Sequence, residues 1–230
     1  MTLIDSLIEE GWLKTPRIIE AFKKIKRVDF LPEDMKDLAE LNEALPIGYG
    51  QTISQPLVVA FMLEQLEPKE GDKILDIGSG SGWTSALLGE IVGGKSLSAG
   101  RQGKVIAIDI ILELVEFGKN NVAKYNFLAP YRTEGSGAGI EKGLPAGRQG
   151  IVEFICTDGS KGYKKEAPYD KILASASAQS LPQAWKEQLK IGGRIVTPID
   201  TSIWVFIKKN EEEFEEYEYP GFVFVPLVTK

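Results

Sequence analysis

The sequence predicts an α/β fold, with a doubly wound and mainly parallel sheet that follows an N-terminal helical extension. Two observations carry this prediction. From Lys73 onward, short apolar runs typical of strands alternate with segments of helical spacing, whereas residues 1–70 show no such alternation. Strands separated by helices form right-handed βαβ units, whose helices cover both faces of one sheet. We therefore expect one domain, 1–230, in which the extension packs on a sheet unit, 71–230.

The strand and helix signals of the sheet unit follow one another along the chain. The strand-like runs are KILDI (73–77), KVIAID (104–109), IVEFIC (151–156), YDKILAS (169–175), RIVTPI (194–199) and SIWVFIKK (202–209). The segments with helical character are WTSALLGEIV (83–92), LELVEFGKNNVAKY (112–125) and PQAWKEQLKIGG (182–193), which is expected to stop at its paired glycines. Most strands are thus separated by a helix, as a parallel sheet requires.

Two helices are predicted in the extension, with a polar segment between them. Thr15-Pro16 precedes an amphipathic apolar pattern (18–25), which predicts a helix capped by Thr15. A second helix is expected over 56–66. The intervening segment PIGYGQTISQP (46–56) holds two glycines, two prolines and no charge, and we expect it to be a loop that faces a substrate.

Two segments look inserted, GGKSLSAGRQG (93–103) and RTEGSGAGIEKGLPAGRQG (132–150). Both are rich in glycine, lack apolar periodicity and end in AGRQG, so we expect long flexible loops. Each joins the end of a helix to the start of a strand. That edge of the sheet is opposite the ligand crevice, which favours tolerated insertions over a phosphate site.

The composition excludes several classes of function. Lysine and arginine number 27 against 33 acids, a net charge of −6, so no basic surplus is available to bind nucleic acid through its phosphates. Acids stand where a signal peptide needs bases, and no apolar run approaches the ~18 residues of a membrane span, so we expect a cytoplasmic protein without a membrane partner. The single cysteine, Cys156, excludes an internal disulfide, and its apolar neighbours predict a buried position.

The absence of histidine restricts the chemistry further. Neither a Ser-His nor a Cys-His nucleophilic pair can form, and no histidine-ligated metal is expected. Any reaction must therefore proceed without an imidazole base.

A glycine-rich turn follows the first predicted strand of the sheet. Ligands of doubly wound sheets bind outside the carboxyl ends of the strands, where Asp76, Asp109 and Asp158 are placed. The turn Gly78-Ser79-Gly80-Ser81-Gly82 has GxGxG spacing instead of GxGxxG, so it does not specifically indicate a pyrophosphate cradle. Alone, it could be a tight turn without a ligand.

The position of Asp109 favours a ligand. Once the inserted residues 94–103 are set aside, Asp109 lies about 20 residues beyond Gly78, the spacing of an acid that accepts ribose hydroxyls. Glycine turn, ribose acid and the Asp158-Gly159 pair together resemble the class I S-adenosylmethionine-dependent methyltransferases. The positive charges of that cofactor suit a site that offers acids.

A narrower resemblance covers about residues 15–128 and 151–228. The motifs that carry it, in chain order, are VDFLP, LPIGYGQTISQP, VVAFMLEQL, LDIGSGSGW, VIAID with LELVE, CTDGSKG, APYDKILASASA, LPQAWKEQLKIGGRIVTPI and FVFVPL. This set is similar to the protein-L-isoaspartate (D-aspartate) O-methyltransferase family. The resemblance implies a Rossmann-like seven-stranded sheet. It also implies methyl transfer from S-adenosyl-L-methionine to the carboxylate of isoaspartyl residues in damaged proteins, which yields S-adenosyl-L-homocysteine and initiates repair through a succinimide.

The resemblance also assigns roles to individual residues. It implies catalytic roles for Ser54 and Thr52. It implies cofactor contacts by Gln51, Thr52, Ile53, Asp76, Gly78, Ser79, Gly80, Gly82, Asp109, Ile110, Asp158 and Gly159. Substrate contacts are implied for Ser54, Gln55, Val59 and Val225. From local sequence alone Ser54 is better explained as a helix cap before Pro56, and the family match favours the site.

The implied reaction agrees with the absence of histidine. A carboxylate with a pKa near ~4 is already ionised at neutral pH, so no general base is needed. Placing it in line with the methyl group can contribute roughly 7–11 kcal/mol. Neutral donors such as the hydroxyls of Ser54 and Thr52 can hold it without the strong neutralisation that a nearby lysine would impose.

Some features depart from the family pattern or leave alternatives open. Asp200 and the serines of SASA (175–178) add polarity near the crevice, the chain stops soon after FVFVPL, and the acidic tract NEEEFEEYE (210–218) is expected to be a solvated connection. The alternatives are a methyltransferase for a small molecule and a non-catalytic binder of isoaspartyl sites or cofactor. We expect a monomer that acts on isoaspartyl proteins and peptides.

Overall fold

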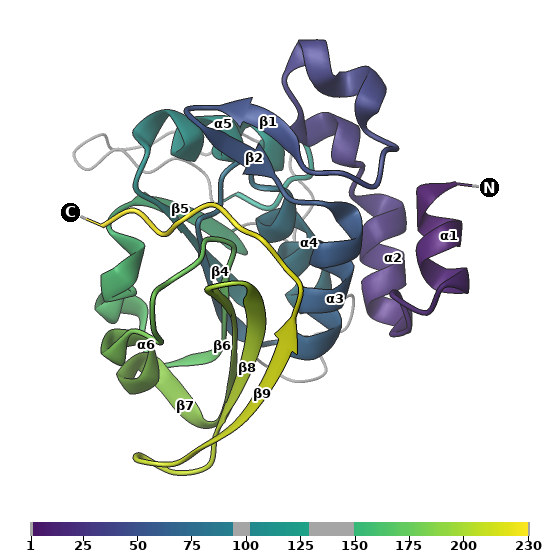
Figure 1. Cartoon of the computed structure of the whole chain (residues 1–230). Helices are drawn as coiled ribbons and strands as arrows, with labels where there is room; N and C mark the ends of the chain where they lie inside the picture. The colour runs from purple at the N-terminus through teal and green to yellow at the C-terminus, as the bar shows by residue number, and fades with distance from the viewer. Residues whose placement is uncertain (1, 94–101, 129–149, 230) are drawn as a thin grey trace, which may run out of the picture.

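A seven-stranded sheet forms the centre of the computed structural model, which describes residues 2–93, 102–128 and 150–229 (Figure 1). The strand order is β5-β4-β3-β6-β7-β8-β9, and only the pairings β7-β8 and β8-β9 are antiparallel. The strands are β3 (Lys73–Ile77), β4 (Lys104–Asp109), β5 (Val152–Cys156), β6 (Tyr169–Ala174), β7 (Leu189–Ile199), β8 (Ser202–Lys208) and β9 (Phe214–Pro220). The predicted doubly wound, mainly parallel sheet is confirmed.

The order of the strands places a crevice beside β3. The chain runs outward from β3 to β4 and β5 and then returns to β6 on the other side of β3. The connections that leave the carboxyl ends of the strands therefore diverge next to β3, which is where ligands of such sheets bind.

Helices cover both faces of the sheet because its strands are apolar on both faces. Ile74 of β3 packs in the larger core cluster, whereas its neighbour Leu75 packs in the second cluster with Trp185. The first face is covered by α3 (Pro56–Leu66), α4 (Trp83–Val92) and α5 (Leu112–Ala123), and the second by α6 (Gln183–Gln188).

The N-terminal extension contains more β-structure than the sequence predicts. It begins with α1 (Leu3–Glu9) and α2 (Pro16–Lys24), followed by the 3-10 turns η1 (Arg27–Phe30) and η2 (Glu33–Leu38), and it ends with α3. The prediction of a loop over 46–56 is wrong as far as Ile53, because β1 (Leu45–Gly48) and β2 (Gln51–Ile53) form an antiparallel hairpin. Tyr49 and Gly50 close it with φ of 55° and 69°, as a two-residue turn between twisted strands needs.

Four local predictions are corrected by the structure. Thr15 precedes α2, but its hydroxyl donates to Glu64 (2.7 Å) instead of capping the helix. The helix expected over 182–193 ends at Gln188, and the acidic tract contributes to β9. Cys156 is exposed, because it lies at the end of the edge strand β5.

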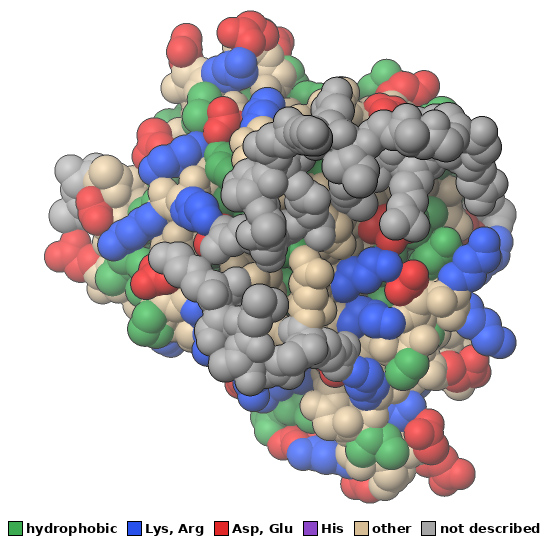
Figure 2. Space-filling model, turned by 180° about the vertical axis from the view of Figure 1, so that it is seen from behind, with side chains coloured by type: hydrophobic (Ala, Val, Ile, Leu, Met, Phe, Trp, Pro, Cys, Tyr) green, Lys and Arg blue, Asp and Glu red, His purple; other side chains and the backbone are tan. Residues whose placement is uncertain are grey.

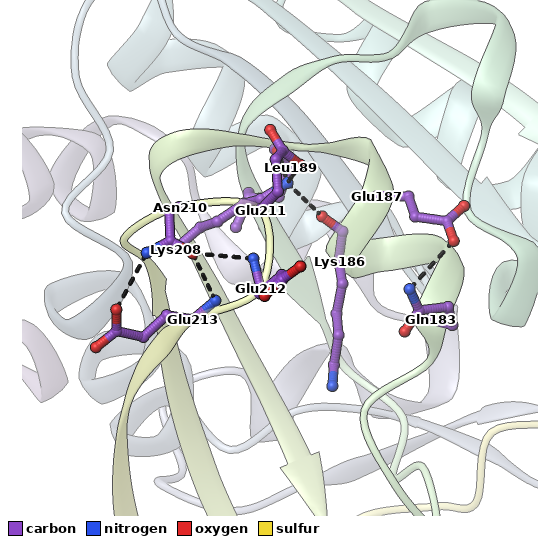
Figure 3. Close-up of polar contacts among 9 residues, drawn as sticks. All are labelled: Gln183, Lys186, Glu187, Leu189, Lys208, Asn210, Glu211, Glu212 and Glu213. Atoms are coloured by element: carbon purple, nitrogen blue, oxygen red, sulfur yellow. Dashed lines mark hydrogen bonds and ion pairs between the residues drawn. The ribbon is translucent and has the colours of Figure 1, made fainter.

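A buried lysine joins α6 to the turn between β8 and β9 (Figure 3). Lys208 is only 2% exposed, and its Nζ donates to the carbonyls of Lys186 (3.0 Å) and Leu189 (3.1 Å). It also pairs with Glu211 at 2.8 Å. The charge is thus stabilised by carbonyls at the C-terminal end of α6 and by one carboxylate.

The remaining predictions concern the two inserted segments and the absence of a membrane span. The insertions expected at 93–103 and 132–150 lie largely outside the described residues. In the part of the chain that the structure describes, every helix is too short or too polar to cross a membrane.

Candidate functional site

A cavity of about 330 Å³ opens at the carboxyl ends of β3 and β4. Three segments distant in sequence surround it: the glycine turn, the β1-β2 hairpin and the C-terminal segment 223–228. The last two lie over the same end of the sheet (Figure 1). Of the predicted site residues, the cavity wall includes Gln51, Thr52, Ile53, Ser54, Gln55, Gly78, Gly80, Asp109, Ile110, Gly159 and Val225.

The glycine turn is held against β4 by main-chain hydrogen bonds. The amides of Gly78 and Ser79 both donate to the carbonyl of Ile108, at 2.9 and 3.1 Å. Gly82 has a φ of 82°, and a Cβ there would lie 2.8 Å from the carbonyl oxygen of Gly118. Only glycine allows this conformation and this close approach to α5.

Asp109 closes β4 and turns its carboxylate toward the glycine turn. Its Oδ2 accepts from the amide of Gly80 (2.9 Å) and its Oδ1 from the amide of Ile111 (3.0 Å). Of the described residues that line the cavity, Asp109 is the only charged one. The carboxylate is thus fixed in orientation and available to hydroxyl or cationic groups of a ligand.

Asp76 lies beneath the glycine turn, off the cavity wall. Ser85 donates to its Oδ2 at 2.6 Å, while its Oδ1 has no partner among the described residues. Burial, together with the charge of Asp109, raises the pKa of Asp76 from 3.8 to about 7, against the opposing effect of Ser85. The buried hydroxyl of Ser79 likewise has no partner among these residues.

The hairpin and the residue that follows it supply a wall of neutral polar groups. Ser54 lines the cavity, while the residue at the N-cap of α3 is Gln55. The side chain of Gln55 does not cap the helix, because its Nε2 donates to the carbonyl of Asn42 (2.9 Å), whereas the Oδ1 of Asn42 accepts from the amide of Leu57 (3.0 Å) in the first turn. The capping explanation for Ser54 is therefore wrong.

The C-terminal segment forms the opposite wall by pairing with residues beyond β6. Ser177 donates from its amide to the carbonyl of Val225 and accepts from the amide of Leu227, both at 2.8 Å. This pairing holds Val225 in the cavity wall. Two residues of the SASA stretch, Ser175 and Ala176, line the cavity. Asp200, the other polar departure from the family pattern, does not line it.

The structure does not bring every predicted residue to the cavity. Val59 is 4% exposed and faces the core, because one helical step separates it from Val58, which does line the cavity. Asp158 is also off the wall, since its Oδ1 accepts from the amide (3.0 Å) and hydroxyl (2.7 Å) of Ser160. Its Oδ2 pairs with Lys161 at 3.0 Å.

Gly82 and Ser79 shape the turn from outside the wall. Sequence reasoning missed Trp83 and Thr84, which line the cavity at the start of α4. Their position directly after the last glycine of the turn is the signal that could have identified them, because such a helix begins at the crevice.

Comparisons with known proteins indicate the family of the chain. The family described as protein-L-isoaspartate(D-aspartate) O-methyltransferase matches residues 1–230. A protein-L-isoaspartate O-methyltransferase of Methanopyrus kandleri is 36% identical over 98% of this chain and 89% of its own length. Another, from Archaeoglobus fulgidus, is 40% identical over 92% of this chain and 84% of its own length.

Solved structures share the fold. A structure of a protein-L-isoaspartate O-methyltransferase is 26% identical, with a TM-score of 0.77 over 97% of this chain and 64% of that chain. A Plasmodium falciparum structure in complex with S-adenosyl-L-homocysteine has a TM-score of 0.78 at 20% identity, over 99% of this chain and 97% of its own. The match over the whole chain, with relatives at this level of identity, means that the chain belongs to the protein-L-isoaspartate(D-aspartate) O-methyltransferase family.

Proposed function

We propose that this protein transfers a methyl group from S-adenosyl-L-methionine to the carboxylate of L-isoaspartyl residues in damaged proteins and peptides. The resulting ester initiates repair through a succinimide. The observation that carries the proposal is the family match over residues 1–230, which includes both the glycine turn and the hairpin wall.

The residues of the cavity wall, and two buried polar groups just behind it, fit the cofactor. Asp109 presents an oriented carboxylate, and the Oδ1 of Asp76 and the hydroxyl of Ser79 are buried without partners among the described residues. The cofactor offers ribose hydroxyls, an ammonium and a sulfonium, which are donors and positive charges. We propose that Asp109 and the glycine turn hold its ribose and amino-acid portion, while Ile110 and Gly159 lie against its adenine. When bound, the cofactor supplies an electrophilic methyl group, whose transfer to a carboxylate oxygen breaks the carbon–sulfur bond and needs no proton transfer.

The hairpin wall suits a carboxylate nucleophile. An isoaspartyl carboxylate is ionised at neutral pH, so the protein has to orient it and does not have to deprotonate it. The wall offers hydroxyls and amides of Thr52, Ser54 and Gln55, and among the described wall residues no lysine or arginine neutralises the negative charge. We propose that Ser54 and Thr52 hold the carboxylate and that Val225 contacts the substrate backbone.

The proposal is tested by methyl transfer from labelled cofactor to an isoaspartyl peptide and to its aspartyl twin. We expect transfer to the isoaspartyl peptide only, and slower transfer by Ser54→Ala. Ser6→Ala, which changes a serine of α1, is the matched control and should keep the full rate. Cofactor binding without transfer to either peptide would refute the proposal and favour a small-molecule enzyme or a non-catalytic binder.

We further propose that the protein is a cytoplasmic monomer, built as one domain, without nucleic-acid or membrane partners. The net charge of −6 argues against a nucleic-acid partner, and basic side chains lie interspersed with acidic ones on the face shown in Figure 2. Sedimentation at micromolar concentration tests the oligomeric state, since a dimer would contradict it.

A further inference from the structure

Arg27 is a buried cation whose hydrogen bonds all go to main-chain carbonyls. Its side chain belongs to η1 and only 7% of the residue is exposed. Nη1 donates to the carbonyls of Ala39 (3.1 Å) and Leu41 (3.0 Å). Nη2 donates to those of Glu43 (2.7 Å) and Ser54 (3.4 Å). One guanidinium therefore holds four carbonyls that come from two separate segments.

These two segments are the two ends of the β1-β2 hairpin. The chain between Ala39 and Glu43 leads into β1, and Ser54 directly follows β2. Because both ends of the hairpin are hydrogen-bonded to the same guanidinium, Arg27 holds the base of the hairpin together. The carbonyl of Ser54 carries this constraint to a residue of the cavity wall.

Arg27 also contacts a residue of the cavity wall. Its guanidinium carbon lies 5.5 Å from the centroid of the ring of Trp83, and Trp83 lines the cavity. A planar guanidinium can stack on an aromatic ring and donate in its own plane at the same time, which an ammonium cannot. Burial lowers the pKa of Arg27 to about 10, so the group stays charged at neutral pH.

We propose that Arg27 is a positioning residue, which holds Ser54 and the hairpin wall in register with the glycine turn through the carbonyls of both hairpin ends. The effect on methyl transfer rests on the proposed function, whereas the effect on the hairpin does not. In this proposal neutral donors in the cavity hold the substrate carboxylate. Arg27, the cation that orders those donors, does not line the cavity.

The test compares Arg27→Ala and Arg27→Lys with a matched control, Lys208→Met. Lys208 is also buried and also donates to two main-chain carbonyls, but it lies at the β8-β9 turn, at the opposite end of the sheet from the hairpin (Figures 1 and 3). Loss of Lys208 should lower the melting temperature without disturbing the wall. It therefore separates general destabilisation from misplacement of Ser54.

Two readouts are measured on the full chain. The first is kcat/KM for an isoaspartyl peptide. We expect about a 10- to 100-fold loss in Arg27→Ala, partial recovery with added guanidinium ion but not with ethylammonium, and less than about a twofold change in Lys208→Met. The second is amide hydrogen exchange. Amides of β1 and β2 should exchange faster in Arg27→Ala, while those of β3 and β4 stay protected.

The outcomes separate this inference from the proposed function. A wild-type chain that methylates no isoaspartyl peptide overturns the function, and the exchange data then decide the role of Arg27 alone. Unchanged exchange in the hairpin, or equal kinetic losses in the Arg27 and Lys208 variants, overturns the inference. If Arg27→Ala does not fold, Arg27→Lys is used, because it keeps the charge but loses the planar fork of donors. Its hairpin exchange and its kcat/KM then test whether the guanidinium positions Ser54.

Discussion

The raised pKa of Asp76 predicts that the contribution of this residue to stability falls as the pH rises from acid to neutral. Asp76 is fully buried, and its pKa of about 7 in the folded state lies above its ordinary value of 3.8. Between these two pH values the folded state binds a proton that the unfolded state has released. The folded state is therefore favoured at low pH, and this advantage is lost as the pH approaches 7.

The magnitude follows from the difference between the two pKa values. Each unit is worth about 1.4 kcal/mol, so ionising Asp76 costs about 4 kcal/mol above pH 7 and less than half of that at pH 5. Asp76→Asn removes this dependence. Its amide nitrogen would replace the oxygen Oδ1, which has no partner among the described residues, so the variant carries a cost of about 1–3 kcal/mol at every pH.

Urea unfolding of wild type and Asp76→Asn without cofactor, followed by circular dichroism at pH 5 and pH 8, measures the effect. The free energy of unfolding of Asp76→Asn relative to wild type should rise by about 2–3 kcal/mol between pH 5 and pH 8. The pH 5 to pH 8 change in unfolding free energy is compared between the two proteins. This comparison cancels both the fixed cost of the amide and the titration of the groups that the two proteins share. Ser85→Ala should act oppositely and steepen the fall of stability, because it removes the hydrogen bond that favours the charged carboxylate.

The same variant tests the role of Asp76 in the site. Calorimetric titration with S-adenosyl-L-homocysteine should show weaker binding to Asp76→Asn at pH 8, where the variant is expected to be the more stable protein. A relative stability that is the same at both pH values would refute the raised pKa. Unchanged cofactor affinity would refute the assignment of Asp76 to the cofactor site.

Three other substitutions test separate parts of the structure. Gly82→Ala should lower stability by more than about 2 kcal/mol in urea unfolding, because φ is 82° and the new Cβ would meet the carbonyl of Gly118; a smaller loss would mean that α5 can move away. Tyr49→Asn should raise the melting temperature, since asparagine tolerates the φ of 55° better than tyrosine does, and a decrease would show that the exposed ring is stabilising. Asp109→Asn should weaken binding of S-adenosyl-L-homocysteine by about 10-fold or more by calorimetry, and unaltered binding would remove Asp109 from the cofactor site.

The parts of the fold that depend on local pattern could be predicted from the sequence. β3, α4 and β4 have the bounds that were expected, because a buried parallel strand reads as an apolar run and the glycine turn marks its exit. The position of Asp109 followed from the same pattern once the insertion was set aside. The family resemblance supplied the hairpin wall and the C-terminal wall, which lie far apart in the sequence and meet only in the fold.

The parts that failed depend on tertiary contacts. β1 and β2 are only four and three residues long, so their alternation is too short to read, and their turn uses tyrosine where asparagine or glycine would be the usual signal. β9 lies at the edge of the sheet with an acidic exposed face, which hides its apolar pattern. A basic residue such as Arg27 is normally exposed, and its four carbonyl partners become visible only when 39–43 and Ser54 are brought together.

The distribution of charge around the cavity connects these features. A carboxylate nucleophile needs to be held, but a cation at hydrogen-bond distance would lower its reactivity, and a cofactor with two positive groups needs acids. The described wall accordingly contains one charge, Asp109, with Asp76 buried beneath the glycine turn. The nearby cation, Arg27, donates its hydrogen bonds to backbone carbonyls and contacts the cavity wall through Ser54 and Trp83. A protein without histidine can thus orient an anion rigidly while keeping positive charge one layer away from it.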